Sequence, residues 1–144
     1  MMATDWDAWF LKLADYISQV SKDPSTKAGC VIARPDRTVA SMGYNGFPRG
    51  VLDLEERLND RPTKYAMVVH AEANAVLSAY ERLGGCTAYV NFMPCSSCAG
   101  MLIQAGIARI VAPHPTDAQR ERWGESFAHA ITMLGEAGVQ LDLV

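Results

Sequence analysis

The sequence predicts an α/β fold of three layers, in which a mixed sheet of about five strands carries helices on both faces. A helix and a β-hairpin come first, and helices then alternate with strands to the end of the chain. The chain has 144 residues, 49% of them hydrophobic and 20% charged, which is the balance of an ordinary globular protein. This length is typical of one domain, so we expect residues 1–144 to form a single domain.

The N-terminal part predicts a helix followed by a hairpin. Apolar residues recur at helical spacing from Trp6 to Val20, and Pro24 lies just beyond the end of that pattern. Two apolar runs at 29–33 and 38–42 flank a short turn and are typical of paired strands.

The middle of the chain, residues 43–69, has no clean period and contains three glycines and two prolines. We expect a long loop there, or short irregular helix, and long loops in compact domains are usually functional. The remaining segments alternate in type. Helices are predicted at 70–83, 95–105 and 119–137, and strands at 87–92, 108–112 and 139–144.

Charge and hydropathy disfavour several classes of protein. The formal net charge of −3 disfavours a surface built to neutralise the phosphates of a long nucleic acid. No run approaches the roughly 18 apolar residues of a membrane span, and the first ten residues include no basic side chain. We therefore expect a cytoplasmic protein without a signal peptide that does not bind membranes, and the charge disfavours polymeric nucleic acid as a partner.

Four cysteines occupy positions 30, 86, 95 and 98. Cys30 lies in an apolar run and Cys86 follows two glycines at a predicted strand start, so we expect both to be packing residues. Only Cys95 and Cys98 have the spacing of metal ligands.

Two short motifs fall at the starts of neighbouring predicted helices. His70-Ala71-Glu72 opens one helix, and Pro94-Cys95-Ser96-Ser97-Cys98 opens the next after a single strand, which brings both motifs to the same edge of the sheet. The positive end of a helix lowers the pKa of a thiol toward the thiolate that zinc binds. His70, Cys95 and Cys98 would hold one zinc ion per chain and leave the fourth tetrahedral position to water.

Glu72 is the expected catalytic residue. Zinc lowers the pKa of a bound water enough to supply hydroxide near neutral pH, and a carboxylate two residues beyond the histidine can move protons without being a ligand. His-x-Glu together with Pro-Cys-x-x-Cys is the signature of zinc-dependent nucleobase deaminases. A structural zinc site would need a fourth ligand, and a redox pair of cysteines would leave His70 and Glu72 without a role.

The chain resembles the deoxycytidylate deaminase family from about Ser21 to Val139. The resemblance implies a cytidine deaminase-like fold and hydrolysis of dCMP to dUMP and ammonia, in which zinc-bound hydroxide attacks C4. The segments that carry it occur in the order of the family and are Ser21-Lys22-Asp23-Pro24, Gly43-Tyr44-Asn45-Gly46-Phe47-Pro48, Lys64-Tyr65, His70-Ala71-Glu72-Ala73-Asn74-Ala75, Tyr89-Val90, Met93-Pro94-Cys95 and Ile103-Gln104-Ala105-Gly106-Ile107.

Three substrate contacts follow from the same resemblance. The Ala71 amide would donate to the pyrimidine O2, and the Met93 carbonyl would accept a hydrogen bond from the exocyclic amine. Asn45 would contact a sugar hydroxyl. Such a buried polar set orients the base and rejects analogues that lack a partner.

A nucleotide substrate also needs a phosphate site. The candidates are the basic or hydroxyl side chains that flank the expected pocket, Lys22, Ser25, Lys27 and Arg49.

The chain departs from the family in two places. Residues 112–123 differ from the corresponding part of the family, and a second zinc motif, which some relatives carry, is missing here.

Other interpretations stay open at this point. The same chemistry could act on a nucleoside, a nucleoside triphosphate, or a free or modified base. A deaminase of tRNA or single-stranded DNA would need a basic groove with aromatic platforms, which the acidic composition disfavours. A third possible class is a non-catalytic binding module in which zinc only stabilises the fold.

Self-association is a further expectation. The predicted helix 95–105 is apolar on nearly every side, and one sheet face buries only part of it. We expect another chain to cover the rest, in a dimer or a multiple of it, and the family resemblance favours this. Cover by the first or last helix of the same chain is the alternative.

Overall fold

Five strands form one mixed sheet in the order β2-β1-β3-β4-β5 in a computed structural model that describes residues 3–144. β1 pairs antiparallel with both β2 and β3, whereas β3, β4 and β5 run parallel. This confirms the predicted mixed sheet. The strands are β1 (Gly29–Ala33), β2 (Val39–Tyr44), β3 (Thr87–Val90), β4 (Arg109–Ala112) and β5 (Gln140–Leu143).

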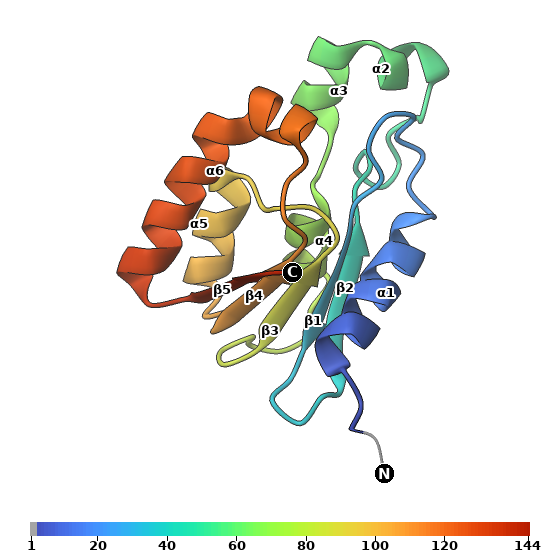
Figure 1. Cartoon of the computed structure of the whole chain (residues 1–144). Helices are drawn as coiled ribbons and strands as arrows, with labels where there is room; N and C mark the ends of the chain where they lie inside the picture. The colour runs from blue at the N-terminus through green and yellow to red at the C-terminus, as the bar shows by residue number, and fades with distance from the viewer. Residues whose placement is uncertain (1–2) are drawn as a thin grey trace.

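Helices cover both faces of the sheet, as predicted (Figure 1). Every residue of β1 is buried, because successive side chains point to opposite faces and both faces are covered. Val31 belongs to the smaller core beneath α1, and Ile32 to the larger core on the other face. No helix within residues 3–144 combines the length and apolarity needed to cross a membrane. The helices are α1 (Trp6–Ser18) on one face and α4 (Ala71–Leu77), α5 (Ser96–Gln104) and α6 (Asp117–Ala137) on the other.

Two short helices occupy the segment expected to be a loop or irregular helix. These are α2 (Glu55–Asn59) and α3 (Arg61–Met67), and they lie beyond one end of the sheet (Figure 1). Asp60 caps α3 by accepting a 3.2 Å hydrogen bond from the Thr63 amide, and Pro62 lies in the first turn.

Two predicted helix boundaries differ from the structure. The helix expected over 70–83 ends at Leu77, because the apolar spacing that continues to Leu83 belongs to an irregular segment whose Leu83 side chain packs into the core. The last helix begins two residues earlier than residue 119. Thr116 and Gln119 cap each other's backbone amides in a capping box, which fixes that start.

α6 of the same chain packs against α5. Leu102 of α5 is buried in one cluster with Phe127 and Leu134 of α6, and the exposed residues of α5 are the polar Ser97 and Gln104. The last helix therefore covers part of the apolar surface of α5, and Met101 and Ile103 stay partly exposed. The oligomeric state itself stays a prediction.

Candidate active site

The two sequence motifs meet at one edge of the sheet. His70 is the N-cap of α4, Cys95 is the N-cap of α5, and Cys98 lies in the first turn of α5. Each motif thus occupies a helix start, as expected, with β3 between them in the chain. The start of α5 directs positive partial charge at both thiols, which favours their thiolate forms.

The separations within this group fit tetrahedral zinc. The Nδ1 atom of His70 lies 3.3 Å from the Sγ of Cys98 and 3.6 Å from the Sγ of Cys95. Zinc ligands at bond lengths of roughly 2.0 Å for nitrogen and 2.3 Å for sulfur stand about 3.5 Å apart across a tetrahedral angle. Within residues 3–144, no other cluster of three or more His, Cys, Asp or Glu has a comparable geometry.

The two thiols and the imidazole are electrostatically coupled. Hydrogen bonding with Cys98 and, to a smaller extent, with His70 lowers the pKa of Cys95 to about 4, against the effect of burial. The same bond and burial raise the pKa of Cys98, and hydrogen bonding with Cys95 raises that of His70. Zinc binding would displace the proton that the pair of thiols shares.

Glu72 lies beside the candidate ligands, two residues along the chain from His70. Its side chain is buried, with the whole residue 5% exposed. Burial raises the pKa of Glu72 above the usual range for a carboxyl group, and the nearby His70 acts in the opposite direction. A carboxyl with a raised pKa is suited to take up and release protons near neutral pH.

The other two cysteines, Cys30 and Cys86, are buried in the larger hydrophobic core. The prediction that both are packing residues is therefore confirmed.

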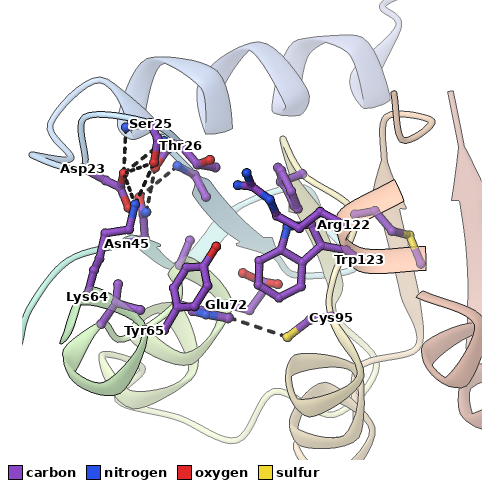
Figure 2. Close-up of a pocket in the computed structure, with 16 residues that line it drawn as sticks. Asp23, Ser25, Thr26, Asn45, Lys64, Tyr65, Glu72, Cys95, Arg122 and Trp123 are labelled. Atoms are coloured by element: carbon purple, nitrogen blue, oxygen red, sulfur yellow. Dashed lines mark hydrogen bonds and ion pairs between the residues drawn. The ribbon is translucent and has the colours of Figure 1, made fainter. Parts of the chain in front are cut away.

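His70 and Glu72 line a cavity, and Figure 2 shows Glu72 among the residues around it. Ala71 and Met93 line it and are almost fully buried, and Asn45 lines it from the end of β2. The three residues expected to contact the base and sugar are thus grouped around one space. The N–H of Ala71 is at the first position of α4, where no intrahelical acceptor exists.

Asn45 holds the loop that precedes β1. Its Oδ1 accepts from the Ala28 amide at 2.9 Å, and its Nδ2 donates to the Thr26 carbonyl at 2.9 Å. One N–H and one lone pair of this side chain stay available for a ligand, because each amide group has two of each.

A buried ion pair forms another part of the cavity wall. Lys64 Nζ lies 3.1 Å from Asp23 Oδ1, with side chains only 8% and 7% exposed, and donates to Ser25 Oγ at 2.7 Å. Burial raises the pKa of Asp23, but hydrogen bonds from Thr26, Ser25 and Lys64 outweigh it and leave that pKa below the ordinary value. Of the proposed phosphate residues, Ser25 is the one that lines the cavity.

The other three phosphate candidates are not among the residues that line the cavity. Lys22 is exposed and pairs with Asp53 at 3.0 Å, and Arg49 is exposed in the loop after β2. Lys27 donates to the Ser21 carbonyl at 2.7 Å. The structure therefore does not bring them to the group formed by His70 and its neighbours.

Several lining residues were not expected from the sequence, and four of them come from two helices. Lys64 and Tyr65 come from α3, and Arg122 and Trp123 come from α6. The rings of Tyr65 and Trp123 contact each other with centroids 5.8 Å apart. The Lys64-Tyr65 dipeptide within the family-like segments was a signal for the first two, whereas no local motif marks Arg122 or Trp123.

The comparison with known families places the chain. Residues 4–113 match the family described as the cytidine and deoxycytidylate deaminase zinc-binding region. The chain belongs to this family of zinc-binding deaminases, and His70, Cys95 and Cys98 are the residues able to hold the metal.

Individual relatives agree with this assignment. An uncharacterized deaminase encoded in the luxG 3′ region of Aliivibrio fischeri is 39% identical over 140 residues, which are 97% of this chain and 94% of that protein. Deoxycytidylate deaminase of Homo sapiens is 35% identical over 113 residues, covering 74% of this chain and 64% of the human protein. The chain thus spans slightly less than two thirds of the human enzyme.

A solved structure matches the whole fold. The crystal structure of dCMP deaminase from the cyanophage S-TIM5, in complex with dCMP and dUMP, superposes with a TM-score of 0.77 over all of both chains. The sequence identity is 23%, so this likeness establishes the α/β deaminase fold.

Proposed function

We propose that this protein catalyses the zinc-dependent hydrolysis of dCMP to dUMP and ammonia. The observation that carries the proposal is the buried Glu72 beside His70, Cys95 and Cys98 at the cavity. A zinc ion that only stapled the fold would have no use for a buried carboxyl at this place. The 35% identity to human deoxycytidylate deaminase supports the choice of substrate.

Each site residue has a role in this reaction. Zinc would supply Lewis acidity that activates water at neutral pH. Glu72 takes the proton of that water, passes it to the ring nitrogen N3, and delivers the second proton to the departing amine. Water thus adds at C4, the C4–N bond breaks, and the amine leaves as ammonia.

The cavity walls orient the base and the sugar. The Ala71 amide would donate to O2, and the Met93 carbonyl would accept from the exocyclic amine, since both residues line the cavity. These buried groups would lose their partners with an analogue that lacks either atom, which favours cytosine. The available N–H of Asn45 would contact a sugar hydroxyl.

A substrate panel tests the proposal. Zinc-loaded protein is incubated with dCMP, deoxycytidine, dCTP, cytosine and an adenine nucleotide, and ammonia and the deaminated product are measured. We expect dUMP and ammonia in equal amounts from dCMP and the highest kcat/KM for that compound. A higher kcat/KM for another compound of the panel would identify that compound as the substrate. Release of ammonia from none of the compounds would contradict the proposal.

We also propose that the protein acts as a homo-oligomer in the cytoplasm. Exposed apolar side chains at and after the end of α4, Leu77 and Tyr80, support a contact with a second chain. Unpaired thiols at Cys30 and Cys86 suit a reducing compartment. Light scattering during size-exclusion chromatography measures the assembly, and a fully active species of 15.7 kDa would contradict it.

A further inference from the structure

The cavity wall contains two cationic side chains, Lys64 and Arg122. Lys64 already has partners, because its buried Nζ lies 3.1 Å from Asp23 Oδ1 and donates a hydrogen bond to Ser25 Oγ. This pair is neutral as a unit, so it offers little net charge to an anionic ligand.

Arg122 differs from Lys64 in having no acidic partner. Among residues 3–144, the carboxylates that form ion pairs engage other cations, and none pairs with Arg122. Its side chain is exposed at the rim of the cavity. In Figure 2 it extends from α6, above the Trp123 ring, toward the loop that carries Ser25 and Thr26.

The packing of α6 explains why Arg122 lies there. Ser126 of α6 accepts a 2.8 Å hydrogen bond from the Ser96 amide at the start of α5, next to Cys95. Residues three and four apart share one face of a helix, so Trp123 and Arg122 lie on the face that Ser126 turns toward the site. α6 is therefore held against the metal-ligand helix, with Arg122 one turn beyond the contact.

The chemistry of Arg122 suits a phosphate. A guanidinium group presents several N–H donors in a planar fork that matches phosphate oxygens, and it keeps its charge at any physiological pH. Apart from the candidate metal ligands His70 and Cys95, the other lining groups that carry charge are Glu72 and the Asp23–Lys64 pair. An anionic substrate would therefore find its free cation at Arg122.

We propose that Arg122 binds the 5′-phosphate of the substrate and sets the preference for a nucleotide over a nucleoside. The inference rests on the proposed deamination of dCMP. It assigns the phosphate contact to α6, outside the residues 4–113 that match the family, and to none of Lys22, Lys27 and Arg49.

Steady-state kinetics on dCMP and deoxycytidine test the assignment. Arg122→Ala should lower the ratio of the two kcat/KM values, dCMP over deoxycytidine, by about 10- to 100-fold, the range of a lost charge-assisted contact. The loss should appear mainly in KM for dCMP, because a contact to a remote phosphate is similar in the ground and transition states.

Arg120→Ala is the matched control. It removes the same charge from the same helix, from an exposed side chain that does not line the cavity, and should leave the ratio unchanged. A fall of equal size on both substrates for Arg122→Ala, or an unchanged ratio, would overturn the assignment.

A binding measurement separates this inference from the proposed function. Calorimetric titration of the zinc-loaded protein with dUMP and with deoxyuridine requires no turnover. We expect wild type to bind dUMP more tightly, and Arg122→Ala to lose most of that preference. If dCMP proves not to be deaminated, this titration still decides the role of Arg122. Wild type without a preference for dUMP, or a variant that retains it, would contradict that role.

Discussion

Asp23 and Lys64 form an ion pair in the cavity wall, where each side chain is less than a tenth exposed. The removal of one partner from a buried pair leaves an uncompensated charge, which typically lowers the free energy of unfolding by about 3–5 kcal/mol. Asp23→Asn and Lys64→Met should therefore each lower the free energy of unfolding by an amount of this order.

The double variant Asp23→Asn, Lys64→Met provides the control, because it leaves no charge unpaired. The decrease in its free energy of unfolding, measured with urea, should be clearly smaller than the sum of the decreases in the two single variants. Additive losses would show that the pair contributes as two independent side chains.

Sequence patterns were informative at the residue scale where the chemistry is local. His70, Glu72, Cys95 and Cys98 lie within two short motifs at helix starts, so their grouping follows from the chain order and the shape of the sheet. The position of Arg122 depends on how the 21-residue α6 packs against α5, and no short-range spacing encodes that contact.

The contact between β2 and α4 shapes the site at the scale of elements. A Cβ atom at Gly43 would meet the Ala75 nitrogen at 2.5 Å and the Ala71 oxygen at 2.7 Å, both of them backbone atoms. Gly43→Ala would therefore displace α4, which starts directly after His70. We expect a loss of about 1–3 kcal/mol in the free energy of unfolding, typical of overpacking, together with a fall in zinc content.

Gly135→Ala in α6 is the matched control for that substitution. A Cβ there meets nothing within 4 Å, and alanine is the better helix former by about 1 kcal/mol. This variant should be at least as stable as wild type and keep its zinc. Equal behaviour of the two variants would show that the Gly43 contact does not matter.

The attachment of α1 to the sheet should depend on pH. Arg109 of β4 forms a hydrogen-bonded ion pair with Asp7 of α1, which lowers the pKa of Asp7 below 3.8, and Tyr89 of β3 donates to the same carboxylate. A lowered folded-state pKa stabilises the protein above the unfolded value, and the contribution fades as the pH falls through the folded value.

Asp7→Asn measures this contribution. Wild type should exceed the variant in free energy of unfolding at pH 7, and the difference should shrink below about pH 4, where Asp7 becomes protonated. Urea unfolding at pH 7, 5 and 3 gives the three values. A difference that stays constant down to pH 3 would exclude the ion pair as its cause.

The predictability of the elements varied for physical reasons. The hairpin and the parallel strands follow from apolar runs with turn residues between them. The end of α4 at Leu77 could not be predicted from the sequence, because apolar spacing looks the same in a helix and in an irregular segment that packs on the core. The capping box of Thr116 and Gln119 was a usable signal for the start of α6.

At the scale of the whole molecule, the metal should be stoichiometric. Three protein ligands and one water complete a tetrahedron, so purified protein should contain about one zinc per chain. Cys95→Ala and Cys98→Ala should each lower the zinc content, measured by elemental analysis, whereas Cys86→Ala, at a buried cysteine outside the metal group, should keep it. Full zinc retention in both ligand variants would contradict the site.

The most direct test of zinc-dependent deamination compares wild type with Glu72→Gln on dCMP. An amide matches the shape of the carboxyl but cannot carry protons, so the variant should keep its fold and its zinc. Its rate of ammonia release should fall by about 10²- to 10⁴-fold or more, because one residue serves several proton transfers. Equal rates of ammonia release from the two zinc-loaded proteins would contradict the account.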